Sequence, residues 1–193
     1  MRVLLLAVLL LSVAAAFGRD DPEERVAALL TLMQGDLGRP ATAGRRARLL
    51  ESASVLPVML REARASATEV EQSRRLYPLM QRGRREAATQ TVNRLAARHP
   101  FRPAVPAQDP ARLRAIGGRI HRQACAGCHD HPVAHAFLPA ENLFRLACAQ
   151  AYPLMEARLY LGVKGMAAEG HRNPFDAGER AALASWYRSG CAK

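Results

Sequence analysis

The chain has 193 residues, of which 49% are hydrophobic and 23% charged; this excludes a protein that is disordered throughout and allows one domain or two small ones. The net charge of +11 is almost entirely arginine, because Lys164 and Lys193 are the only lysines. The arginines are spread along the chain without a basic cluster or an aromatic stacking platform, which argues against a nucleic-acid reader and leaves acidic proteins or anionic lipids as partners for a basic surface.

Residues 1–18 predict a secretory signal peptide. Arg2 precedes an apolar run from Val3 to Ala14, and small residues follow. The run is too short to span a bilayer comfortably, so we expect cleavage after Ala16 or Gly18 and a mature protein without stable membrane insertion. Export to the periplasm follows, and an exported compartment favours disulfides over free thiols.

Alanine, leucine and arginine dominate the remaining chain and β-branched residues are few, so we expect an all-α fold. In residues 19–98, a region of unknown role, the first helix starts at Asp21, an N-cap residue followed by proline, and ends near Gly35. The second helix covers about 42–65, and Pro57 predicts a kink or a break within it.

The third helix of this region is predicted to start at Thr68, where Glu71 has the spacing of a capping box. The fourth covers about 84–98. Short connections make neighbouring helices antiparallel, so a small up-and-down bundle is expected. His99, at the end of this region, is predicted to be exposed.

Proline-rich residues 99–108 predict a semi-rigid linker, and residues 109–193 predict a second compact helical unit. Its first helix starts at Asp109–Pro110 and runs into Cys125. Further helices are expected at about 140–150, 153–162 and 177–189. The last of these starts with Asp176 and Glu179 at capping-box spacing and ends at Gly190.

The stretch QACAGCHDHP, after the first helix of this unit, has four interpretations: zinc, a thioredoxin-like redox pair, a disulfide between neighbours, or covalent haem. A structural zinc site needs four ligands, so His131 and His135 would have to complete the set that the motif begins. A redox pair follows a strand in an α/β domain, and no strand pattern is present. The Cys-x-x-Cys-His spacing of Cys125, Cys128 and His129 in an exported protein favours attachment of haem c.

The haem interpretation gives each residue of the motif a role. Cys125 and Cys128 are three positions apart on one turn, so their thiols can reach the two vinyl groups of one porphyrin and form thioethers. His129 is the expected proximal iron ligand. Its other ring nitrogen should donate to a backbone carbonyl, at or near Pro132.

The second axial ligand of the iron is predicted to be Met166. It lies in a glycine-rich loop, where packing in a helix does not account for an apolar side chain. His171 in the same loop is the rival, and an open or differently ligated iron remains the third alternative. The other methionines are expected to be core residues on apolar helix faces: Met33, Met59, Met80 and Met155.

Residues 109–193 resemble a class I monohaem cytochrome c. GRIHRQACAGCH is similar to the first helix of that family and its haem motif, LYLGVKGM to the segment of its methionine ligand, and FDAGERAALASWYRSG to its last helix. The chain departs from the family at two positions. His121 stands where the family has an aromatic residue that packs on one of the last helix, here Trp186 or Tyr187, and Ala167 stands where a proline usually follows the methionine.

The haem takes two of the four cysteines, and the even remainder predicts a disulfide between Cys148 and Cys191. Such a bond would tie the C-terminal tail to the helix at 140–150. Two separate thiols, with Cys148 buried and Cys191 exposed, are the alternative.

A single haem with two axial ligands predicts a periplasmic electron carrier rather than an enzyme. Its redox partner proteins should have acidic docking surfaces that the arginines attract. Two alternatives stay open: a haem enzyme or gas- or peroxide-responsive sensor with an open distal position, and an accessory haem subunit of a periplasmic redox complex. The candidate residues for the haem pocket are Leu113, Ile120, Leu143, Phe144, Leu159 and Trp186.

Overall fold

The structure is a computed structural model that describes residues 21–103, 110–130, 140–162 and 173–192, and it confirms the all-α fold, since these ranges contain helices and connections but no strand. The helices are α2 (Pro22–Leu37), α3 (Ala43–Glu62), α4 (Ala67–Arg74), α5 (Leu76–Gln81), α6 (Arg85–Arg98), α7 (Pro110–Ile120), α8 (Ala126–His129), α9 (Leu143–Cys148), α10 (Tyr152–Leu161) and α11 (Ala177–Arg188). A π-helical turn, His121–Cys125, joins α7 to α8, and a 3₁₀ turn, Ser189–Ala192, follows α11. No helix in the described ranges has the length and apolar character needed to cross a membrane.

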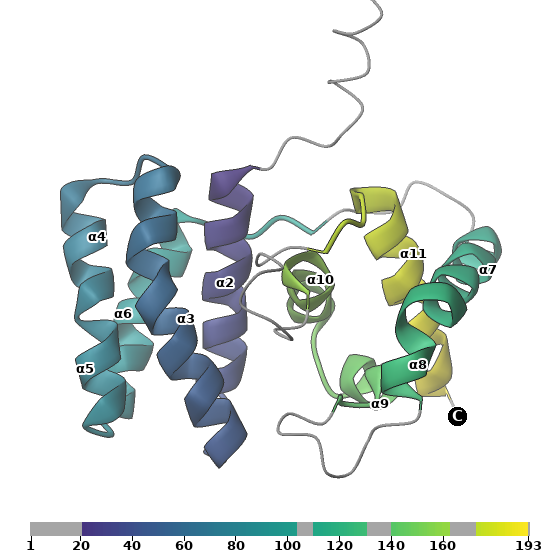
Figure 1. The fold of residues 1–193 in the computed structure, drawn as a ribbon, viewed down its shortest axis with the longest axis horizontal. Coiled ribbons are helices and arrows are strands. Elements are labelled where there is room, and N and C mark those ends of the chain that lie inside the picture. Colours follow the sequence, from purple (N-terminus) through teal and green to yellow (C-terminus); the bar gives the residue numbers. More distant parts are fainter. Residues whose placement is uncertain (1–20, 104–109, 131–139, 163–172, 193) are drawn as a thin grey trace, which may run out of the picture.

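Helices α2 to α6 form a bundle in which α2 has α3 and α6 on one side and α10 on the other (Figure 1). Helix α2 begins at Pro22 because the Asp21 carboxylate accepts a hydrogen bond from the Glu23 N–H. It ends at Gly38, beyond the predicted end at Gly35. Helix α3 runs without a break past Pro57, so the predicted division of this helix is wrong.

The capping box of the third predicted helix lies two positions earlier than expected. Ser66 Oγ accepts from the Glu69 N–H at 3.3 Å, and Glu69 Oε2 accepts from the Ser66 N–H at 2.9 Å. Glu71 instead pairs on the surface with Arg74. Both registers satisfy the capping-box pattern, so local sequence could not distinguish them.

His99 is buried, not exposed as predicted. Its Nε2 lies 3.3 Å from Glu69 Oε1, and Arg98 approaches the same carboxylate at 3.6 Å. The hydrogen bond from Ser66 holds the pKa of Glu69 below its ordinary value, against the opposing effect of burial. The start of the linker is therefore fixed to the bundle through a charged contact.

The core of the bundle continues into α10, on the far side of the proline-rich linker in the sequence. Ala157, Tyr160 and Leu161 belong to the same apolar cluster as α2, α3, α5 and α6. A Cβ added at Gly35 would lie 2.5 Å from Leu154 Cδ2, so the missing side chain lets α10 approach α2 closely. The linker residue Phe101 also packs against Tyr160.

Buried charges cross the same boundary. The Arg180 guanidinium of α11 binds Glu156 on α10 at 3.3 Å and Glu24 on α2 at 3.0 Å, and it lies 4.7 Å from the centre of the Tyr160 ring. Glu156 is fully buried and Arg180 is 4% exposed. Pairing is what makes two buried charges tolerable, so these contacts specify how α2, α10 and α11 meet.

The remaining helices form a second apolar cluster around α11, which crosses α7 and also contacts α9 (Figure 1). Helix α11 begins at the predicted capping box: Asp176 Oδ1 accepts from the Glu179 N–H, and Glu179 Oε2 accepts from the Asp176 N–H. The crossing with α7 is close because Gly117 and Gly118 face Trp186 and Ala182. This arrangement places the end of α7, and the turn after it, against α11.

Candidate functional site

The Cys-x-x-Cys-His motif lies on a tight helical turn that continues α7. The π-helical turn ends at Cys125, and α8 carries Cys128 and His129. The Ala126 N–H donates to the His121 carbonyl, and the Asp130 N–H donates to the Ala126 carbonyl at 3.0 Å. The three motif side chains therefore project from consecutive helical turns of one short segment.

Both cysteines of the motif are free thiols and are not bonded to each other. Cys128 is exposed and Cys125 is half-buried. Burial raises the pKa of the Cys125 thiol, and a hydrogen bond with Tyr187 partly opposes that rise. In this structure the interpretation as a disulfide between neighbours does not apply, and both sulfurs are available for another bond.

His129 is oriented by a hydrogen bond from one ring nitrogen. Nδ1 lies 2.6 Å from the backbone carbonyl oxygen of Glu141, which can only accept, so Nδ1 carries a proton and donates to it. In the neutral tautomer of the ring, Nε2 then has the lone pair. A backbone carbonyl was expected here, but Pro132 lies outside the described residues. Glu141 was missed because it is twelve residues away, beyond the reach of local sequence reasoning.

An apolar wall stands beside the motif. Of the six predicted pocket residues, five belong to one cluster with Ala147, Met155 and Tyr187: Ile120, Leu143, Phe144, Leu159 and Trp186. Leu113 is buried but lies outside that cluster. The Trp186 indole N–H is buried and meets no acceptor in the described part of the chain, so it is a donor available to a bound group.

His121 is the polar member of this wall. Its ring is 3% exposed and meets Tyr187 and Phe144 edge to face, with ring centres 5.4 and 5.7 Å apart. It thus packs on an aromatic residue of the last helix. Nδ1 lies 3.0 Å from the Tyr187 hydroxyl, and Nε2 lies 3.1 Å from Asp130 Oδ2. No local pattern in the sequence indicated these two hydrogen bonds.

Met166 and His171, the two candidates for the distal ligand, lie outside the described residues, as do His131 and His135. The ends of their loop are described. Asn173 Nδ2 donates to the Leu159 carbonyl at 2.8 Å, and the Asn173 N–H donates to the Tyr160 carbonyl at 2.9 Å. Gly162 has φ of 74°, which favours glycine, and faces Asn173. Both ends of the loop therefore meet at the end of α10.

The methionines predicted as core residues are buried, with exposed fractions of 7% or less: Met33, Met59, Met80 and Met155. The first three belong to the cluster of the bundle and Met155 to the cluster around α11. Packing therefore accounts for each of them.

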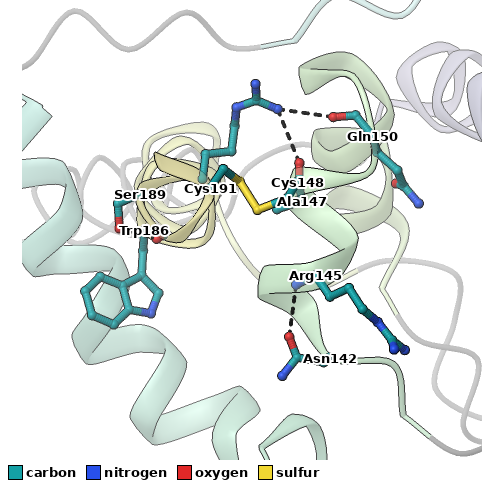
Figure 2. Close-up of a disulfide and its surroundings, with 9 residues drawn as sticks. Asn142, Arg145, Ala147, Cys148, Gln150, Trp186, Ser189 and Cys191 are labelled. Carbon is teal, nitrogen blue, oxygen red and sulfur yellow. Dashed lines mark hydrogen bonds between the residues drawn. A yellow bond between two sulfur atoms is a disulfide. The ribbon is translucent and has the colours of Figure 1, made fainter. Parts of the chain in front are cut away.

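Cys148 and Cys191 lie at bonding distance, as the sequence predicted, with 2.06 Å between their sulfurs (Figure 2). Cys148 ends α9 and Cys191 lies in the 3₁₀ turn after α11. Arg188 Nη1 donates to the carbonyls of Ala147, the residue before Cys148, and of Gln150. The bond joins α9, which carries Leu143 and Phe144 of the wall, to the end of α11.

The described residues offer no group of three or more Cys, His, Asp or Glu side chains that could hold a metal ion. They also contain no strand to provide the α/β setting of a thioredoxin-like pair. Two free thiols, a histidine whose Nδ1 donates to a backbone carbonyl and an adjoining apolar wall fit a covalently attached haem.

No family model matches this chain, and no curated protein or solved structure matches it either.

Proposed function

We propose that the protein is a periplasmic c-type cytochrome that carries single electrons through one covalently bound haem. The observation that carries this proposal is the hydrogen bond between His129 Nδ1 and the Glu141 carbonyl. With Nδ1 engaged, Nε2 is the ring nitrogen left to bind the iron, and two free thiols lie on the same helical segment. The resemblance of residues 109–193 to class I monohaem cytochromes c supports the same function.

In this function each residue of the motif has a separate task. Cys125 and Cys128 would hold the haem by two thioethers, each formed by addition of an S–H bond across a vinyl group. His129 Nε2 would bind the iron, and the hydrogen bond from Nδ1 to the Glu141 carbonyl would fix the ring orientation. Bound haem supplies the ferric–ferrous couple. Met166 is the proposed distal ligand and His171 its rival.

The surroundings of the motif are suited to electron transfer rather than to substrate chemistry, so we assign no catalytic residue. The apolar wall, which includes Ile120 and Trp186, would exclude water from one side of the site. The net charge of +11 favours redox partners with acidic surfaces, and their association should weaken as salt is added. Export rests on residues 1–18, which lie outside the described ranges.

The test is expression in a periplasm that has haem-attachment machinery, followed by mass spectrometry and absorption spectra. We expect one covalent haem on the wild type, none on the double variant Cys125→Ser/Cys128→Ser, and one on the matched control Cys148→Ser/Cys191→Ser. The ferrous spectrum should not change with carbon monoxide. Met166→Ala should then allow carbon monoxide to bind, and His171→Ala should not.

Two results would redirect the proposal. Rapid binding of carbon monoxide to the wild type contradicts a carrier with two protein ligands and favours the enzyme or sensor with an open distal position. A haem protein that purifies only in a stable complex favours the accessory subunit. A wild type without covalent haem contradicts the proposal altogether.

A further inference from the structure

His121 makes two polar contacts inside an otherwise apolar wall. Both of its ring nitrogens bind side chains, one from α11 and one from the segment that follows α8. An edge-to-face contact with Tyr187 and Phe144 would be equally available to phenylalanine. Packing alone therefore does not account for a buried imidazole, whose polar atoms must be satisfied.

The direction of these hydrogen bonds follows from the available protons. The Asp130 carboxylate only accepts, so His121 Nε2 donates to it and Nδ1 accepts from the Tyr187 hydroxyl. Tyr187 keeps its proton, because burial raises its pKa. The Tyr187 hydroxyl also interacts with the Cys125 thiol. The contacts of His121 with Tyr187 and Asp130 do not involve that sulfur.

This series of contacts ends next to the proximal histidine. Asp130 directly follows His129, and its side chain is 38% exposed. A side chain this exposed is not held in place by burial, so its position depends on the hydrogen bond with His121. Tyr187 and His121 are fully buried or nearly so. The Asp130 carboxylate is thereby tied to the crossing of α7 and α11, while the Glu141 carbonyl orients the His129 ring from the other side.

We propose that His121 is a positioning residue for the proximal histidine: through its bonds to Tyr187 and Asp130 it fixes the turn that presents His129. This inference rests on the proposed haem function, because only a bound haem would make His129 the proximal iron ligand. The contacts that fix the turn are present in the haem-free chain as well. A positioning role also explains why a histidine replaces the family's aromatic at this position. The imidazole retains the contact with the last helix and adds a polar bond to the motif.

Hydrogen–deuterium exchange of the full haem-free chain with reduced thiols tests whether His121 fixes the turn. His121→Phe keeps the ring contact and removes both bonds, and Asp130→Ala removes the acceptor. Each should raise the exchange rate of the amides in 126–130 about tenfold, the scale of one hydrogen bond to a charged group. The double variant should exchange no faster than either single variant. Asp130→Asn keeps an acceptor and should restore slow exchange.

The matched control is Val92→Ala, which removes buried volume from α6 in the bundle without touching the turn. It should lower overall stability and leave the exchange of 126–130 unchanged relative to the rest of the chain. In the haem-loaded protein, the midpoint potential should shift in His121→Phe but not in Val92→Ala. Val92→Ala leaves the contacts of His121 in place, so a shift confined to His121→Phe reports the loss of those contacts beside His129.

Unchanged exchange in His121→Phe, or effects that add in the double variant, would overturn the inference. So would an unaltered potential in the loaded variant. These results leave the haem function standing, because exchange is measured on the haem-free chain and the potential is measured only on a wild type that has taken up haem. A wild type that never takes up haem overturns the proposed function, and the role toward an iron ligand with it.

Discussion

Gly117 of α7 lies so close to Ala182 of α11 that a Cβ added to it would be 2.1 Å from the Ala182 carbonyl oxygen. The obstacle is backbone, which cannot rotate away as a side chain can. The crossing that supports the Cys-x-x-Cys-His motif therefore depends on the absence of one methyl group.

Gly117→Ala should force α7 and α11 apart and lower the free energy of unfolding by about 1–3 kcal/mol, the usual cost of overpacking. Gly44→Ala is the matched control, since an added Cβ there meets only the end of Arg48 at 3.9 Å. It should leave stability unchanged or raise it by up to about 1 kcal/mol. Urea denaturation measures both, and equal stability of the two variants would contradict the close crossing.

Arg180→Met should strongly destabilise the protein because it removes the guanidinium from the buried carboxylate of Glu156 and from Glu24. A loss of about 3–5 kcal/mol is expected from breaking a buried pair. Adding Glu156→Gln should recover part of that loss. The surface variant Arg74→Met, which breaks a pair with two half-exposed partners, should cost less than about 1 kcal/mol.

Thermal or urea unfolding of Arg180→Met, of the double variant and of Arg74→Met compares these effects. A double variant less stable than Arg180→Met alone would show that the carboxylate of Glu156 is satisfied by other groups.

Removal of the disulfide in the double variant Cys148→Ala/Cys191→Ala should lower the free energy of unfolding by about 4 kcal/mol on the chain-entropy model, because the two residues are 43 positions apart. Dithiothreitol should reduce the stability of the wild type to that of the variant. It should not affect the variant, whose remaining cysteines are free thiols. A wild type that is insensitive to the reductant would contradict a bond that stabilises the fold.

The carboxylate of Glu69 should make stability depend on pH. Its pKa in the folded protein lies below the ordinary value of 4.5, chiefly because Ser66 donates to it. The resulting stabilisation is present above the ordinary pKa and is lost as the pH falls through the lowered value. Glu69→Gln should therefore be less stable than the wild type at pH 7, by about 1 kcal/mol, with a difference that shrinks below pH 4.5.

Urea denaturation between pH 3 and pH 7 tests this dependence. Glu71→Gln, two positions on and exposed, is the control and should change stability by roughly 0.5 kcal/mol or less. A difference between Glu69→Gln and the wild type that stays constant across the range would show that charge plays no part in the contact.

The features that sequence predicted well are local ones. The capping box of Asp176 and Glu179 and the approximate ranges of the helices depend on residues within a few positions of one another. The Cys148–Cys191 pairing was found by counting cysteines in a chain that the sequence predicts to be exported. The spacing of Cys125, Cys128 and His129 is equally local, and the haem attachment that it indicates stays a prediction.

What the sequence did not indicate depends on contacts between distant positions. His99 looked exposed because its partner Glu69 is thirty residues away. The Glu141 carbonyl and the bonds of His121 were missed for the same reason, since no periodic pattern records which backbone oxygen or carboxylate will reach a ring nitrogen. Arg180 gave no signal because an arginine in a basic chain is unremarkable until three helices enclose it.

Helix α10 has two buried sides, one in the core shared with α2 and one in the cluster around α11. Proteolysis in the linker would therefore not yield two independent proteins. The C-terminal fragment would expose to water the side of α10 that carries Tyr160 and Leu161. The N-terminal fragment would lose the part of its core that α10 provides. Two such fragments produced separately should be poorly soluble and should recover their fold when mixed, as complementary halves of one molecule.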